Sequence, residues 1–157
     1  MKFVKTFILL ACTHLAMSQI NVKKEFDYAA KQYEGMLASH PDLTKFPQST
    51  NPDGSPHDMK SEWWCSGFFG GSLWYLYEYT HDPKWKDAAE KWTMAVAKEQ
   101  YNTGTHDLGF MMFCSFGNAK DIDPKPEYKE ILIQSAKSLA SRFDPKVGCI
   151  KSWDSNK

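Results

Sequence analysis

The sequence lacks an excess of charge of either sign. Its 157 residues carry 19 basic and 19 acidic side chains, and the pI is near 6.9. The basic footprint of nucleic-acid-binding proteins is therefore missing, and we exclude nucleic acid as a partner. The sequence also contains neither a C-x-x-C pair nor an H-E-x-x-H motif. It thus offers no support for a metal site, and we expect no cofactor.

No apolar run is long enough to span a bilayer, so we expect no membrane span. The first 18 residues instead have the order of a secretory signal: two lysines, an apolar run over residues 7–16, and the small-x-small cleavage site Ala16-Met17-Ser18. We predict that residues 1–18 are a signal peptide and that the mature chain begins at Gln19. The protein is then exported, either to the periplasm or out of the cell.

Cysteine is scarce, with four in the whole chain. Cys12 ends the stretch Leu9-Leu10-Ala11-Cys12, which resembles a lipoprotein box, but the apolar run continues past it, so we favour signal cleavage over lipid attachment. Loss of Cys12 with the signal leaves an odd number of cysteines, which does not indicate a disulfide framework. Cys65 and Cys114 lie in apolar helical stretches, where free cysteine commonly behaves as a small buried hydrophobe.

Apolar residues recur with helical spacing along most of the chain. Three segments have an apolar stripe on one side, as surface helices have, and two are apolar almost all round, as interior helices are. The one-sided helices are expected at 22–37, 83–96 and 128–143, and the interior ones at 63–79 and 106–116, with Gly117 ending the last. Residues 40–59, with four prolines and Gly54, are expected to form a long loop.

The pattern repeats along the chain. Trp64 and Asp107 are 43 positions apart, Gly67-Phe68 and Gly109-Phe110 are 42 apart, and Asp82-Pro83 and Asp123-Pro124, which we expect to precede one-sided helices, are 41 apart. A period of this length indicates a repeated helical hairpin. Alternating interior and one-sided helices need two layers, so the predicted fold class is all-α, as a double ring of helices or a stacked solenoid.

Aromatic or titratable residues lie at the start of each expected interior helix, and a similar group follows the last helix. These residues are Trp63 and Trp64, His106 and Asp107, and Trp153 and Asp154. If they gather at the N-termini of the interior helices, they favour an anionic ligand. An acidic sugar suits aromatic planes better than a phosphate does, since no phosphate-loop motif is present. Close helix packing explains the cluster of Gly67, Gly70 and Gly71 better than a phosphate cradle does.

From these residues alone, three functions stay open. Asp107 could serve an enzyme as an acid or base, or the aromatic cleft could bind acidic glycan without catalysis. In the third case the chain is a helical scaffold in which His106 and Asp107 only cap a helix, a position that aspartate favours.

Four stretches after Met59 follow the order and the intervals of a known family. They are residues 64–74, 106–110, 136–143 and 148–154. With the helices between them, they resemble the unsaturated glucuronyl hydrolases, glycoside hydrolase family 88. The resemblance implies an (α/α)6 barrel, or six-hairpin toroid, of which residues 19–157 form the N-terminal portion. Six repeats of about 43 residues would need roughly 260 residues.

The resemblance also implies an activity. The family removes 4,5-unsaturated glucuronic or related uronic acid from the non-reducing end of lyase-generated acidic oligosaccharides, such as glycosaminoglycan disaccharides. A carboxylic acid protonates the vinyl-ether double bond, water adds to it, and the hemiketal opens. By the same resemblance, Asp107 is one of two catalytic carboxylates, His106 contacts the substrate and Trp64 stacks near the sugar. The second carboxylate is expected beyond Lys157, because Asp154 does not match it, and the chain alone is expected to be inactive.

Overall fold

The computed structural model describes residues 20–154. The predicted signal peptide, the lipoprotein-like Cys12 and the predicted mature start at Gln19 lie outside this range. The described helices are α2 (Val22–Ser39), α3 (Ser66–Thr80), α4 (Pro83–Ala95), α5 (Leu108–Met112), α6 (Asn118–Ile122) and α7 (Pro126–Ala140). A 3-10 turn, η1 (Ala97–Tyr101), follows α4, and a π-helical turn, η2 (Phe113–Gly117), joins α5 to α6. None of the helices in this range is long and apolar enough to cross a membrane.

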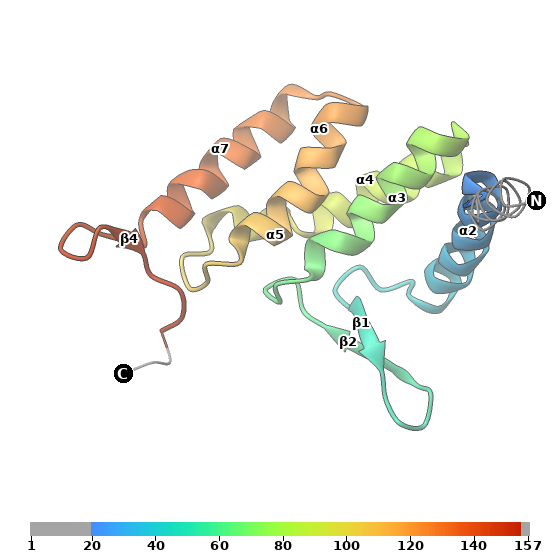
Figure 1. Ribbon diagram of the computed structural model, residues 1–157, viewed down its shortest axis with the longest axis horizontal. Helices are drawn as coiled ribbons and strands as arrows, with labels where there is room; N and C mark the ends of the chain where they lie inside the picture. The colour runs from blue at the N-terminus through green and yellow to red at the C-terminus, as the bar shows by residue number, and fades with distance from the viewer. Residues whose placement is uncertain (1–19, 155–157) are drawn as a thin grey trace, which may run out of the picture.

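The helices form two hairpins that lie side by side, α3 with α4 and α5–α6 with α7 (Figure 1). The predicted helical-hairpin repeat is therefore confirmed. Within the first hairpin, the buried indole of Trp74 donates to the hydroxyl of Thr93 at 2.9 Å. Between the hairpins, the hydroxyl of Ser138 on α7 donates to the carbonyl of Gln100 in η1 at 2.6 Å. The helices thus form a continuous layer around one apolar core.

The start of α4 is as the sequence predicts. Asp82 is the N-cap, its carboxylate accepts from the backbone N–H of Lys84 at 3.0 Å, and Pro83 occupies the first turn. Proline is tolerated there because its missing N–H has no helical partner. The stripe of this helix packs inward through the buried side chains of Trp85 and Trp92.

Three glycines on α3 allow neighbouring helices to approach closely. A Cβ atom built on Gly67 would lie 2.1 Å from the backbone oxygen of Met111, and one on Gly71 would lie 2.2 Å from that of Cys114. Gly70 faces α4 in the same way, with Thr93 atoms 3.2 Å away. The packing explanation for this cluster is confirmed.

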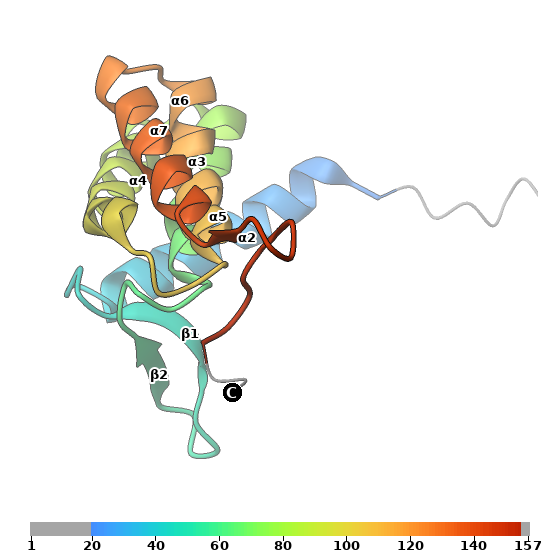
Figure 2. The same cartoon turned by 90° about the vertical axis from the view of Figure 1, so that its left-hand side faces the viewer.

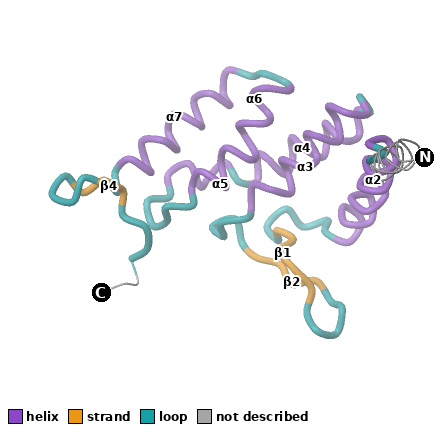
Figure 3. The backbone as a smooth tube through the Cα atoms, in the orientation of Figure 1, coloured by secondary structure: helices purple, strands orange, loops and turns teal. Residues whose placement is uncertain are grey.

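The expectation that residues 40–59 form only a long loop is wrong. They contain an antiparallel hairpin of β1 (Phe46–Thr50) and β2 (Pro56–Met59), shown in orange in Figure 3. Prolines are compatible with a two-stranded hairpin because both strands are edge strands. Gly54, with a φ of +82°, provides the left-handed residue that the connecting turn requires. A second, shorter hairpin joins β3 (Phe143–Asp144) to β4 (Cys149–Ile150).

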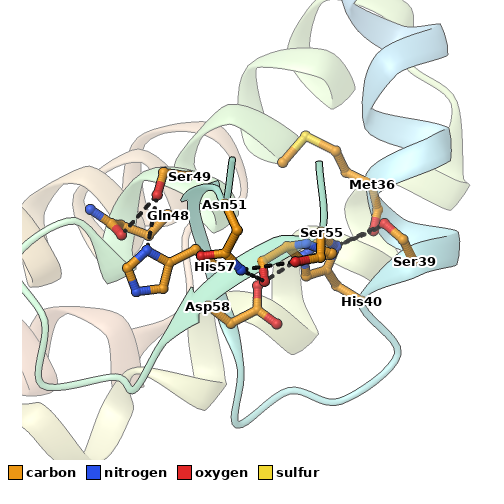
Figure 4. A network of polar contacts seen from close by, with 10 residues as sticks. Met36, Ser39, His40, Gln48, Ser49, Asn51, Ser55, His57 and Asp58 are labelled. Atoms are coloured by element: carbon orange, nitrogen blue, oxygen red, sulfur yellow. Dashed lines mark hydrogen bonds and ion pairs between the residues drawn. The ribbon is translucent and has the colours of Figure 1, made fainter. Parts of the chain in front are cut away.

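A histidine at the end of α2 holds the first hairpin in place (Figure 4). The Nδ1 atom of His40 lies 2.9 Å from the carbonyl oxygen of Met36, and its Nε2 atom lies 3.0 Å from the carboxylate of Asp58 on β2. The ring is almost fully buried between these two acceptors. The hairpin, which projects from the helical layer in Figure 2, is thus tied to α2.

We expect His40→Ala to lower the free energy of unfolding by about 1–3 kcal/mol, because it leaves the Asp58 carboxylate without its buried partner. Urea unfolding followed by circular dichroism measures this. His57→Ala is the matched control, since His57 is exposed and contacts Ser49 at 3.2 Å on the same hairpin. Equal effects of the two substitutions would contradict the anchoring role of His40.

The interior helix that was expected to end at Gly117 runs further. Gly117 has helical dihedral angles, and the chain continues through α6 to Ile122. Asp123 then leaves the helical region because it precedes a proline, which disfavours helical backbone. Helix α7 begins at Pro126, so Asp123-Pro124 does not start it as Asp82-Pro83 starts α4.

The two apolar helices are buried on one side only among residues 20–154. Their inward side chains are buried, namely Leu73, Trp74, Leu108, Met111, Met112 and Phe116. On the other side Phe110 is 50% exposed and Phe113 is 65% exposed. The expectation of helices buried all round is therefore wrong for the described residues, because none of them covers this second face.

The three described cysteines are free. Cys65 and Cys114 are partly buried rather than fully buried as expected, and burial raises the pKa of both thiols. Cys149 is exposed on β4.

Candidate active site

Three chain segments meet at one side of the helical layer and enclose a groove. They are the link into α3, the link into α5 and the segment after β4, all below the helices in Figure 1. The groove has a volume of about 650 Å³ and is lined by Glu62, Trp63, Trp64, Gly104, Thr105, Asp107, Phe110 and Trp153. This volume is in the range of sites for small ligands. The predicted gathering of Trp63, Trp64, Asp107 and Trp153 is confirmed.

Asp107 stands at the N-cap of α5, but within the described residues its carboxylate accepts no capping hydrogen bond. The helix start is closed instead by the backbone oxygen of Asp107, which accepts from the N–H groups of Phe110 and Met111. The backbone N–H of Asp107 donates to the hydroxyl of Thr105 at 3.0 Å, and this hydrogen bond fixes the backbone at Asp107. The carboxylate is therefore available to a ligand in the groove, and the capping-only explanation loses its expected contact.

His106 lies beside Asp107 but is not among the residues that line the groove. Its Nε2 atom is 3.4 Å from the Asp107 carboxylate, and its ring meets the Trp153 ring edge-to-face with the centroids 4.9 Å apart. The Nδ1 atom is buried and has no hydrogen-bond partner within residues 20–154. The geometry joins His106 to both Asp107 and Trp153, and its contact with substrate stays a prediction.

Trp64 forms an aromatic wall with two phenylalanines. Its ring centroid lies 5.6 Å from that of Phe68 and 6.0 Å from that of Phe110, both edge-to-face. Trp64 is 41% exposed, so part of its indole remains available to an apolar sugar surface. Phe110 was not among the predicted site residues, although its spacing of three from Asp107 places both on one side of α5.

Asp154 does not join the groove, although Trp153 does. Its carboxylate lies 2.7 Å from the ammonium of Lys151 and 3.4 Å from the guanidinium of Arg142. Hydrogen bonds from Lys151 and then Arg142 lower the pKa of Asp154. This carboxylate is therefore paired with two cations outside the groove, and the position of the second catalytic acid stays a prediction.

The described residues bring together no group of three or more His, Cys, Asp or Glu side chains that could hold a metal ion. The groove is lined by two carboxylates, Glu62 and Asp107, of which Asp107 lies near an imidazole, and by partly exposed aromatic rings. Such a site can bind a sugar ring and can exchange a proton with it.

Comparison with known proteins gives a consistent result, although no protein-family model matches the chain. An unsaturated glucuronyl hydrolase from Formosa agariphila is 38% identical over 145 residues, which are 86% of this chain and 36% of that protein. The crystal structure of an unsaturated glucuronyl hydrolase specific for heparin has a TM-score of 0.79 at 38% identity, over 86% of this chain and 36% of the other. A mutant of the Streptococcus agalactiae enzyme, complexed with dGlcA-GalNAc6S, has a TM-score of 0.69 at 27% identity, over 79% and 33%.

The chain therefore spans about a third of the length of these relatives. The solved relatives are six-hairpin toroids, which confirms the predicted (α/α)6 fold, and the two helical hairpins described above form part of such a ring. The similarity covers 86% of this chain at 38% identity, and the chain belongs to the unsaturated glucuronyl hydrolase family.

Proposed function

We propose that the whole protein removes 4,5-unsaturated uronic acid from the non-reducing end of acidic oligosaccharides made by polysaccharide lyases. The observation that carries the proposal is the Asp107 carboxylate, which faces an aromatic groove and is not used by the helix that it starts. Asp107 also lies in the stretch 106–110, which resembles the His-Asp motif of the family. Family membership supports hydrolysis of unsaturated uronides as the reaction class.

In the proposed reaction, the sugar ring stacks on the exposed face of Trp64 with its double bond near Asp107. A carboxyl group of the site gives a proton to one carbon of the vinyl ether. The oxygen of water bonds to the other carbon, and the proton that this water loses returns to the carboxylate. The hemiketal that forms then opens and the sugar leaves. Asp107 is one of the two carboxylates of this chemistry, and His106 at 3.4 Å orients it.

The relatives point to glycosaminoglycan fragments as substrates. One solved relative is described as specific for heparin, and another was crystallised with dGlcA-GalNAc6S. We expect the full-length protein to consume unsaturated disaccharides prepared from heparin or chondroitin. Absorbance of the conjugated double bond measures this directly, because hydration removes the conjugation.

Two results would contradict this assignment. If the absorbance of both disaccharide classes stays constant with folded full-length protein, the hydrolase function is wrong. If the protein binds them in calorimetry without consuming them, the groove belongs to an acidic-glycan-binding module, the alternative that the sequence left open.

A further inference from the structure

The three segments that form the groove are joined behind it by two buried charged side chains. The first is Glu99 in η1, which is 6% exposed. One of its carboxylate oxygens accepts from the hydroxyl of Ser61 at 2.6 Å, and the other accepts from the side-chain amide of Asn102 at 2.9 Å. Glu99 thus uses both oxygens to bind two different segments.

Those two segments carry the residues of the candidate site. Ser61 is three positions before Trp64, and Asn102 is five positions before Asp107. The Asn102 side chain also accepts from the N–H of Gly104 at 2.9 Å, so the link into α5 is held in a defined turn. Hydrogen bonds to a charged group are stronger than neutral ones, and their loss in a buried position leaves a polar group unsatisfied.

The second side chain is Arg142, the only arginine in the sequence. Its side chain is almost fully buried, and its guanidinium donates to the carbonyl oxygens of Thr103 at 2.5 Å, Ser152 at 2.7 Å and Lys151 at 3.0 Å. Thr103 follows Asn102 in the link into α5, and Ser152 precedes Trp153. The planar fork of arginine suits such a set of fixed acceptors, which a lysine could not satisfy together.

We propose that Glu99 and Arg142 are positioning residues that hold Trp64, Asp107 and Trp153 in one working geometry. Neither lines the groove, so each acts through the segment that it binds. The expected effect of these two residues on turnover rests on the proposed function. Their effect on how rigidly the groove segments are held is independent of the proposed function, and the two effects are measured separately.

Glu99→Gln in the full-length protein separates positioning from stability. If the glutamine oxygen accepts from Ser61, its NH2 faces the NH2 of Asn102. If the amide is flipped, it accepts from Asn102 and donates to the Ser61 oxygen, and both charge-assisted bonds become weaker neutral ones. Adding Asn102→Asp restores a donor–acceptor pair and keeps the oxygen that binds Gly104. We expect kcat to fall about tenfold or more in Glu99→Gln, with a smaller change in KM, because a misplaced catalytic group lowers the rate steeply. In the double variant we expect kcat to recover most of that loss.

Kinetics are measured well below the melting temperature, where every variant is folded by circular dichroism, so lost stability alone leaves kcat unchanged. Glu90→Gln is the matched control, because it weakens only the partly buried ion pair between Glu90 on α4 and Lys125, which precedes α7 and is not among the residues that line the groove. Wild-type kcat in Glu99→Gln, or a loss that Asn102→Asp does not recover, overturns the proposal.

Hydrogen exchange provides the readout that is independent of activity. In both Glu99→Gln and Arg142→Lys, we expect the backbone amides of residues 102–108 to exchange at least about tenfold faster than in the wild type. In Arg142→Lys, the amides of residues 151–154 should also exchange faster. The amides of α4 should keep their wild-type protection in both variants. Unchanged exchange in both segments overturns the positioning roles. If the wild-type protein consumes no unsaturated disaccharide, the proposed function fails, and the exchange data still decide the positioning roles.

Discussion

Asp107→Asn in the full-length protein should lower the turnover of an unsaturated disaccharide about a hundredfold or more, the usual scale for a positioned acid or base. The melting temperature should change by less than about two degrees, because asparagine caps a helix as well as aspartate does. The Asp107 carboxylate also makes no capping hydrogen bond within the described residues. Steady-state kinetics and a thermal melt of the same preparation measure both quantities.

His106→Ala is the companion variant for this test. If His106 contacts the substrate, its loss should weaken the apparent affinity at least as much as it lowers turnover. Near-normal turnover in Asp107→Asn would contradict the catalytic assignment. Asp107 would then have only a structural role at the start of α5. A large drop in melting temperature would show instead that its charge stabilises the fold.

Gly67→Ala should cost about 3 kcal/mol of the free energy of unfolding, the upper part of the range for overpacking. The added Cβ would lie 2.1 Å from the backbone oxygen of Met111 and 2.6 Å from that of Phe110. Both are main-chain atoms of α5, so no side-chain rotation can relieve the clash. Helices α3 and α5 must separate, and Asp107 at the start of α5 moves with them.

Gly35→Ala is the control for this substitution. Gly35 lies in α2, where a Cβ would meet nothing within 4 Å. Alanine there should stabilise the protein by about 0.5–1 kcal/mol through helix propensity. Urea unfolding of both variants measures the difference. A Gly67→Ala protein as stable as wild type would contradict the close approach of α3 and α5.

The sequence determined those parts of the structure that depend on short-range spacing. The one-sided stripe around Trp85 and Trp92 predicted α4, and Asp82-Pro83 predicted its first residue, because both signals act within a helical turn. The repeat of 41 to 43 residues indicated paired helices, and it placed Trp64 and Asp107 at equivalent ends of neighbouring hairpins. The resemblance to the family predicted site roles for the same two residues, Trp64 and Asp107.

Only the tertiary structure decided the features that depend on distant partners. The hairpin in residues 40–59 is tied down through His40 and Asp58, which are 18 positions apart, so local proline content gave the wrong expectation. Gly117 stays helical because the surrounding backbone continues through it.

The same limit applies to the site. The capping preference of aspartate is local, but whether the Asp107 carboxylate turns to the helix or to the groove depends on Thr105, Phe110 and Trp153 around it. Neither Glu99 nor Arg142 was predicted to act at the site, although Arg142 lies in one of the stretches that resemble the family, because their partners Ser61 and Thr103 lie 38 and 39 positions away. Local spacing thus identified Trp63, Trp64, Asp107 and Trp153, which line the groove. Long-range packing selected the residues that hold them, because a buried charge takes its role from the segments that fold around it.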